Sequence, residues 1–326
     1  MDKALLLPAL VLLALLPSSP GAVPAGDVQV FILAGQSNMV GAGKVDIDAK
    51  AANGGAGTLR HMVGDPAAAR FAHLVNADKS WVVRDDVWIS SFERKGGLSV
   101  GYGSGADRIG PEFSFGHRVG EKIDEPVLLI KAAWGGKSLA VDFRPPSAGK
   151  IPYSLGEQGD KRLEEDPGFV GQSYREMMAE LRRVMNERDT IFPELKGRKA
   201  VLRGFAWHQG WNDRINDRFN GEYESNMIHF ITDVRKELGV PELPFAIAET
   251  GMTGPGETHP RALSLMEAQR KAAEHFGKAG RVAFVATRGF WRPKEQSPSG
   301  QGYHWNSNAE TYYLIGEGLA DALLGL

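Results

Sequence analysis

Short apolar runs alternate with amphipathic stretches along most of the chain. This alternation is typical of α/β proteins, in which helices separate buried parallel strands. The runs have the length of strands and are bounded by glycine, proline or charged residues. They predict six strands, at residues 28–34, 86–92, 126–133, 201–207, 243–248 and 281–286.

Helices are predicted between the strands wherever apolar residues recur three or four positions apart. Pro111 and Glu112 favour the start of one helix. The capping-box pattern at 307–310 predicts that the last helix begins there. Two apolar stripes, which we interpret as core packing, comprise Tyr174, Met177, Leu181 and Val184, and Tyr223, Met227, Phe230, Val234 and Leu238.

Two segments, residues 40–85 and 139–168, are rich in Gly, Pro, Ala and charge and are too long for ordinary connections. Neither is of low complexity, and strands resume after each, which disfavours a linker to a second domain. We therefore expect both to be excursions of one domain, residues 26–326, that wall a substrate cleft. There is no internal repeat.

The N-terminus has the three parts of a signal peptide. Lys3 precedes an apolar run at 4–16, which is followed by prolines and then by small residues. The run is shorter than the roughly 20 residues that span a membrane. We expect residues 1–25 to be removed and the protein to be exported, to the periplasm or the medium; an uncleaved membrane anchor is the alternative.

The composition of the chain excludes several kinds of catalytic chemistry and of binding partner. The chain has no cysteine, which excludes disulfides, a thiol nucleophile and cysteine-ligated zinc. The formal net charge is -2 with both signs interspersed, so we expect no nucleic-acid partner. The histidine spacing contains no HExxH pattern, and we expect neither a metal nor a cofactor.

Polar, glycine-flanked clusters follow three of the predicted strands, at 35–39, 132–138 and 207–213. In a parallel sheet the carboxyl ends of the strands gather the reactive groups. Ser37 stands in the first cluster, where a glycine permits a tight turn that exposes a hydroxyl. Gly135 and Gly136 in the second are suited to point backbone N–H groups at an oxyanion. An ordinary turn is the alternative for Ser37.

The third cluster supplies amides, and a fourth, at 301–306, supplies a histidine before the last helix. Gln209 and Asn212 are able to donate to a developing oxyanion. Residues His208 and Asp213 also fit a local polar network. The positive end of a helix would keep His304 neutral and able to accept a proton; a histidine packed between aromatic rings is the alternative.

Nucleotide binding is disfavoured because both possible phosphate loops are incomplete. Lys131 occupies the position of the first glycine in the loop that would end at Gly136-Lys137-Ser138. The loop that would end at Gly43-Lys44 begins at Asn38 and has Val45 where Ser or Thr belongs.

Taken together, the clusters resemble the SGNH hydrolase superfamily. They are most similar to its sialate O-acetylesterase and acetylxylan esterase branch, carbohydrate esterase family 6. Residues 35–38 read Gly-Gln-Ser-Asn, as that branch does, and residues 207–213 read Trp-His-Gln-Gly-Trp-Asn-Asp, close to its Trp-His/Tyr-Gln-Gly-Glu-Ser-Asp. The resemblance covers nearly the whole mature chain and implies a three-layer α/β/α sandwich with a flavodoxin-like parallel sheet.

The resemblance also implies roles for single residues. Ser37 would be the nucleophile and His304 the general base. The oxyanion hole would take the N–H groups of Ser37 and of Gly135 or Gly136. Its third donor would be the side-chain amide of Gln209 or Asn212, since the wider superfamily and the narrower branch differ on this point.

The chain departs from the family at one position. The superfamily has an aspartate three residues before the histidine, and this chain has Gln301. Losing the acid of a related triad lowers turnover by roughly 10⁴. We consider four possibilities: the Gln301 carbonyl orients the ring, a carboxylate such as Glu295 or Glu249 does so, a backbone carbonyl does so, or the enzyme is slow.

The function implied is that of a serine esterase removing O-acetyl groups from a carbohydrate, such as acetylated sialic acid, xylan or a related glycan. The alternative is a non-catalytic carbohydrate-binding protein that lost its triad acid. A lipase is disfavoured because no apolar lid helix is visible. The sequence predicts no oligomeric state. Residues expected near the substrate are Gln36, Asn38, Trp211 and Trp305, with Trp134 and Tyr303 as further possible sugar platforms.

Overall fold

The computed structural model describes residues 25–46 and 53–326. The predicted signal peptide therefore lies outside the described residues, except for Ala25. Among the described residues, no helix is both long enough and apolar enough to cross a membrane.

A seven-stranded sheet forms the centre of the molecule, in the order β4-β3-β6-β1-β7-β8-β9. All neighbours are parallel except β3 and β4, which form an antiparallel hairpin at one edge. Each of the six predicted strands is present, with ends shifted by at most two residues. The strands are β1 (Val28–Gly35), β3 (Val87–Ser91), β4 (Arg94–Gly97), β6 (Val127–Ala133), β7 (Ala200–His208), β8 (Phe245–Ala248) and β9 (Val282–Val285).

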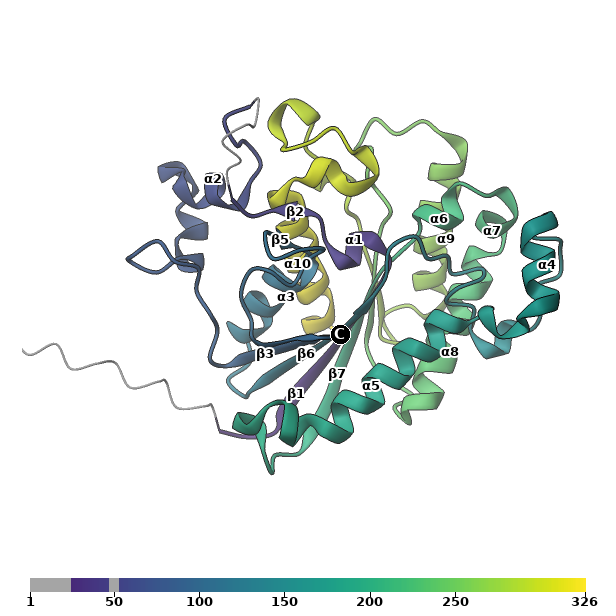
Figure 1. The fold of residues 1–326 in the computed structure, drawn as a ribbon, viewed down its shortest axis with the longest axis horizontal. Helices are drawn as coiled ribbons and strands as arrows, with labels where there is room; N and C mark the ends of the chain where they lie inside the picture. Colours follow the sequence, from purple (N-terminus) through teal and green to yellow (C-terminus); the bar gives the residue numbers. More distant parts are fainter. Residues whose placement is uncertain (1–24, 47–52) are drawn as a thin grey trace, which may run out of the picture.

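Helices cover both faces of the sheet, as Figure 1 shows. One face packs against α5 (Gln172–Ile191), α8 (Tyr223–Leu238) and α9 (Pro260–Phe276). The other packs against α3 (Pro111–Gly120) and α10 (Ala309–Leu324). This confirms the predicted three-layer α/β/α sandwich. Both stripes that we interpreted as core packing lie on helices of the first face, α5 and α8.

The two excursions pack onto this frame as short elements. The first includes η1 (Pro66–Leu74) and α2 (Leu59–Gly64), and its apolar residues pack with α3 and the start of α10. The second contains η2 (Pro146–Ala148), α4 (Glu157–Glu165) and η3 (Pro167–Phe169). The remaining elements are α1 (Ser37–Val40), β2 (Gly43–Lys44), β5 (Arg108–Ile109), η4 (Pro193–Leu195), α6 (Trp211–Arg214), α7 (Asp217–Gly221), η5 (Arg288–Phe290), η6 (Lys294–Gln296) and η7 (Gly302–Ser307).

Two helix starts differ from prediction. The last helix is capped by Asn308, whose side chain accepts from the N–H of Thr311 at 3.1 Å, so it begins later than the predicted capping box implies. Helix α9 was not predicted, and its N-cap is His259 rather than one of the commoner Ser, Thr, Asp or Asn residues.

The position of β1 determines where the site forms. It lies between β6 and β7, and all eight of its residues are buried because helices cover both faces. Gly35 pairs with Ala133 of β6 and with His208 of β7. The carboxyl ends of three neighbouring strands are therefore level, and the clusters that follow them meet at one edge.

Candidate active site

The first strand ends in a glycine that the neighbouring strand requires. Gly35 has a φ of 152°, and a Cβ atom there would lie 2.2 Å from the carbonyl oxygen of His208. A side chain at this point would clash with β7. Ser37 then opens α1 and is partly exposed. No described residue accepts from the Ser37 N–H, which belongs to the first turn of the helix.

Gln36 is a buried tie between β1 and the segment after β7. Its side-chain oxygen accepts from the N–H groups of Gly210 at 3.0 Å and Asn212 at 3.4 Å. Its amide nitrogen donates to the Asn212 side-chain oxygen at 3.3 Å. The residue is 1% exposed. The expectation that Gln36 contacts substrate is therefore wrong. Gln36 instead holds the segment after β7 (the β7 exit, residues 209–212) against the turn that carries Ser37 (the nucleophile turn, residues 35–38).

Asn38 is also buried, so its expected contact with substrate is wrong as well. Its amide nitrogen donates to the carbonyl oxygen of Tyr303 at 3.0 Å. Its side-chain oxygen accepts from the Tyr312 hydroxyl at 2.8 Å. The first bond joins the residue after Ser37 to the residue before His304, and the second joins it to α10. The nucleophile turn and the histidine segment are thus held together.

The glycine pair after β6 forms an exposed turn. Gly136 has a φ of 68°, and a Cβ atom at Gly135 or Gly136 would meet nothing within 4 Å. No described residue accepts from either N–H group. Trp134, just before the pair, donates its N–H to the Gly35 carbonyl at 3.2 Å. The turn is therefore anchored beside the end of β1 and has free donors.

Of the two amides proposed for the oxyanion hole, only Asn212 has a free donor. Gln209 is buried, and its amide nitrogen donates to the Lys137 carbonyl at 2.9 Å and to the Asp213 carboxylate. An amide nitrogen has two hydrogens, so both are used. Asn212 is partly exposed and donates one hydrogen to the Gly136 carbonyl at 2.8 Å. The structure thus contradicts Gln209 as a donor and leaves one N–H of Asn212 available.

Asp213 is a fully buried carboxylate that holds the segment after the glycine pair. It accepts from the N–H groups of Leu139 and Ala140 at 2.9 Å and from Gln209. Burial raises its pKa to about 7, against the opposing effect of these donors. The predicted polar network is therefore present for Asp213. His208 does not join it, because neither ring nitrogen has a partner among the described residues, and burial lowers its pKa to about 3.

His304 lies in a left-handed turn within η7, before α10. The next three residues, Trp305, Asn306 and Ser307, have φ between 52° and 57°, a conformation that costs energy for residues other than glycine. The imidazole is partly exposed, and burial lowers its pKa below the ordinary value. Neither ring nitrogen bonds to a described residue, and neither does the Ser37 hydroxyl. Catalytic hydrogen bonds are often long before substrate binds.

None of the proposed side chains orients the imidazole. The Gln301 side chain is exposed and unbonded within the described chain; its backbone carbonyl instead accepts from the His304 N–H at 2.8 Å. Glu295 is 69% exposed and lies 3.9 Å from Lys294. The buried Glu249 carboxylate is held by Arg288 at 2.9 Å and by the N–H of Thr287. The expectation that Gln301 or Glu295 orients His304 through its side chain is wrong for this structure.

Two aromatic rings stand at the rim of the site. Trp211 and Tyr303 have centroids 5.7 Å apart, and Tyr303 lies 4.5 Å from the His304 ring. Tyr303 is 42% exposed and Trp211 partly exposed. The Arg214 guanidinium lies over Trp211 at 4.8 Å. Trp305 is fully buried, so its predicted role as a sugar platform is wrong, whereas Trp211 remains placed for one.

A buried ion pair beneath the nucleophile turn was not predicted as part of the site. Lys131 donates to Glu112 at 2.6 Å and to the carbonyl oxygens of Val40 and Tyr102 at 2.8 Å. Burial lowers the pKa of this lysine. It fixes the end of α1 against β6 and α3. A lysine inside an otherwise apolar strand is the sequence signal that could have identified it.

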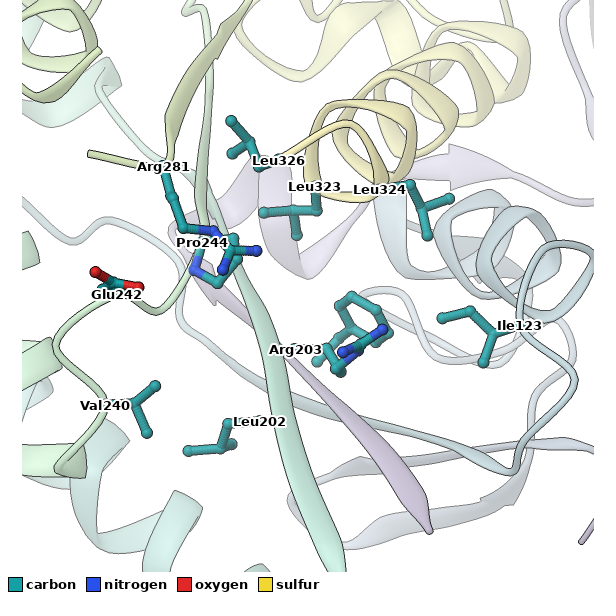
Figure 2. A pocket seen from close by; sticks show the side chains of 11 residues that line it. Ile123, Leu202, Arg203, Val240, Glu242, Pro244, Arg281, Leu323, Leu324 and Leu326 are labelled. Carbon is teal, nitrogen blue, oxygen red and sulfur yellow. The ribbon is translucent and has the colours of Figure 1, made fainter. Parts of the chain in front are cut away.

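A separate cavity lies at the opposite edge of the sheet, near the amino ends of β7, β8 and β9. Its volume is about 500 Å³, and it is lined by apolar side chains from the end of α10 and by Arg203, Glu242 and Arg281 (Figure 2). It has no residue in common with the strand exits. In the described part of the chain, no group of three or more His, Asp or Glu residues is placed to hold a metal.

The fold is the three-layer α/β/α sandwich that the sequence resemblance implies. The chain belongs to the family described as carbohydrate esterase, sialic acid-specific acetylesterase, whose model matches residues 27–325. The resemblance stated from the sequence is thereby confirmed at the family level. Membership supports an esterase activity in general terms.

Solved structures share this fold at low sequence identity. A protein from Arabidopsis thaliana is 18% identical with a TM-score of 0.54, and the match covers 92% of this chain and 98% of that one. A carbohydrate acetylesterase from Xanthomonas citri is 14% identical with a TM-score of 0.53, covering 92% of this chain and 57% of that one. No curated protein sequence matches the chain significantly.

Proposed function

We propose that this protein is a serine esterase that removes O-acetyl groups from a carbohydrate through an acetyl-enzyme. The observation that carries the proposal is the junction at the end of β1. There, Ser37 opens a helix beside free N–H groups, and Asn38 bonds to the segment that carries His304. A nucleophile, a base and oxyanion donors are thus supplied by segments held to one another.

The proposed reaction begins with a neutral His304, which the lowered pKa favours. The imidazole takes the proton of Ser37 as the hydroxyl oxygen attacks the acetyl carbonyl. Negative charge on the tetrahedral intermediate is stabilised by the N–H groups of Ser37 and of Gly135 or Gly136, and by the free amide hydrogen of Asn212. As the intermediate collapses, the bond between the acetyl carbon and the sugar oxygen breaks, and the imidazolium gives its proton to that oxygen, which leaves an acetyl group on Ser37. Water, deprotonated by His304, then releases acetate and regenerates Ser37.

An acetylated sugar is the substrate class that the rim of the site favours. Trp211 and Tyr303 present ring surface beside His304, and aromatic rings with polar edges suit ligands that are partly apolar and partly hydroxylated. The family description and the Xanthomonas citri neighbour both refer to acetylated carbohydrates. Acetylated sialic acid, acetylated xylan and related glycans are the candidates to assay.

The experiment is p-nitrophenyl acetate hydrolysis by residues 26–326 and by the Ser37→Ala variant from pH 5 to 9. We expect activity that rises through a histidine titration and is reduced to background by the substitution. Equal background rates for both proteins would contradict the esterase.

A second substitution tests the sugar platform separately. Trp211→Ala should raise KM for acetylated oligosaccharides about tenfold while changing p-nitrophenyl acetate hydrolysis by less than about twofold, because the small ester carries no sugar ring to pack on the indole. An equal effect on both substrates would contradict the platform.

We also propose that the protein is exported, on the evidence of the signal-peptide pattern at residues 1–25. N-terminal sequencing of the protein produced from the full gene should find a chain beginning near residue 26. A chain that retains residues 1–25 in the membrane fraction would instead support the anchor.

A further inference from the structure

The chain has to hold its histidine without the carboxylate that related enzymes use. In a serine-histidine-aspartate triad, the acid orients the imidazole ring. Here the Gln301 side chain is unbonded within the described chain, Glu295 is exposed, and Glu249 is held by Arg288. The position of His304 must therefore come from the backbone that carries it.

That backbone needs external support. Three consecutive residues after His304 are left-handed, and such conformations persist only where neighbouring contacts enforce them. On the far side, the Asn306 side chain donates to the Arg292 carbonyl at 3.0 Å, and Asn308 donates to the Gln296 carbonyl at 3.0 Å. These two bonds hold the turn against the segment at residues 292–296, but neither of them reaches Ser37.

Asn38 and Tyr312 supply the contact on the nucleophile side. The Tyr312 hydroxyl donates to the Asn38 side-chain oxygen at 2.8 Å and lies 3.3 Å from the His304 carbonyl oxygen. The Asn38 amide donates to the Tyr303 carbonyl at 3.0 Å. Both side chains are buried. The pair thus touches the backbone of Tyr303 and His304 from a residue adjacent to Ser37.

We propose that Asn38 and Tyr312 are positioning residues that fix His304 relative to Ser37, in place of a triad acid. The inference rests on the proposed function. Neither residue touches the reacting atoms. The pair acts by keeping the histidine backbone at one distance from α1, and a displacement of about 1 Å in such a geometry is able to lower turnover about 10²-fold.

The test uses Tyr312→Phe, which removes only the hydroxyl, together with Asn38→Ala and the double variant. Tyr174→Phe is the matched control, because its buried hydroxyl also makes one side-chain hydrogen bond, to Glu237 at 2.9 Å, on a helix remote from the site. We expect Tyr312→Phe to lower kcat at least about tenfold with KM changed less than twofold. The double variant should lose little more than the worse single variant, because the two side chains bond to each other and support the same turn.

A second readout does not depend on activity. Carbon-13 NMR titration of the His304 ring, assigned with His304→Gln, should give a higher pKa in Tyr312→Phe than in the wild type, since a loosened turn admits water to the imidazole. Tyr174→Phe should leave this titration unchanged.

The outcomes separate the two proposals. An active wild type, an inactive Ser37→Ala variant and a Tyr312→Phe variant that matches Tyr174→Phe in kcat and in the His304 titration would overturn the positioning role alone. A wild type that hydrolyses no ester would overturn the proposed function. In that case the NMR titration still decides whether the pair controls the environment of His304.

Discussion

Buried amide side chains beside the candidate nucleophile hold the segments of the site together by hydrogen bonds. Gln36 ties the β7 exit to the nucleophile turn, and Asn38 ties that turn to the histidine segment. Gln209 uses both of its amide hydrogens on Lys137 and Asp213. Asn212 is the partly exposed member of this group. The residues of the family motifs thus divide into those that hold the site and those free to meet a substrate.

This division predicts a specific effect of Asn212. Asn212→Ala should lower kcat on p-nitrophenyl acetate about 10²-fold, the usual cost of removing one oxyanion donor. Steady-state kinetics provide the measurement. Asn76→Ala, which removes an exposed amide bonded to Ser80 in a distant loop, serves as the control and should change kcat less than twofold. Equal kcat values for the two variants would exclude Asn212 from the oxyanion hole.

Asp213 predicts how stability depends on pH. Its pKa is raised by burial to about 7 in the folded protein, above the unfolded value of about 3.9. The folded state therefore binds this proton more tightly, and the resulting stability is complete below about pH 4 and is lost as pH rises toward 7. Relative to Asp213→Asn, the wild type should lose a few kcal/mol of unfolding free energy over that range.

Urea unfolding of both proteins at several pH values from 4.5 to 7.5 measures this difference. The contributions of the other titrating groups to the free energy of unfolding cancel in this comparison, because both proteins contain the same groups. A wild type that gains stability over the variant as pH rises would contradict the prediction. It would mean that the three N–H donors, rather than burial, control this carboxyl.

At the scale of elements, the site depends on three strands whose carboxyl ends lie at the same height. It also depends on the close approach of the β1 backbone to the β7 backbone at Gly35. Gly35 pairs with Ala133 on one side and His208 on the other, so the three exits begin at the same height. Lys131 reinforces this junction by bonding the last carbonyl of α1 from within β6. The partly exposed Ser37, the candidate nucleophile, thus stands on a buried and hydrogen-bonded base, which is the arrangement that a preorganised site requires.

Gly35 should be the least replaceable residue of this junction. Gly35→Ala forces a Cβ atom against the His208 carbonyl at a φ that alanine avoids, and should lower the free energy of unfolding by about 2–4 kcal/mol. Denaturant unfolding is the measurement. The control is Gly221→Ala, at a helical position where a Cβ meets nothing within 4 Å, and its stability should change by less than about 1 kcal/mol. Similar losses of unfolding free energy in Gly35→Ala and Gly221→Ala would contradict the close approach of Gly35 to the His208 carbonyl.

At the scale of the whole molecule, the order of strands explains why distant segments meet. The chain places β1 at the centre and lays β6 on one side and β7 on the other, so clusters separated by about a hundred residues share one edge. Helix α10 closes the arrangement, because the segment before it lies above the same edge (Figure 1), and that segment contains His304. The topology thus gathers the candidate nucleophile, base and oxyanion donors.

Much of the fold and part of the candidate site could be predicted from the sequence. Short, mostly apolar runs predicted the six parallel strands, because strands buried on both faces have no regular polar alternation. The motifs placed Ser37, Gly135, Gly136 and His304 correctly at the edge of the sheet or next to it. What periodicity does not encode is burial of polar side chains, so Gln36 and Asn38 were expected to face the substrate.

The remaining errors have the same physical origin. Tyr312 lies on an apolar face of the last helix together with Ile315 and Leu319, and nothing in this local pattern reveals that its hydroxyl meets Asn38. Trp305 was expected at the surface, but the left-handed turn directs it into the core. Such contacts arise from tertiary packing between segments far apart in sequence, which a single chain's pattern does not specify.

The most direct test of the account is to identify the acetylated residue during turnover. Acid-quenched mixtures of enzyme and p-nitrophenyl acetate would be digested and analysed by peptide mass spectrometry. We predict one acetyl group on Ser37, at high occupancy early in the reaction and absent from Ser37→Ala. Ester hydrolysis without acetylation of Ser37, or with an acetyl group that turns over on another residue, would contradict it.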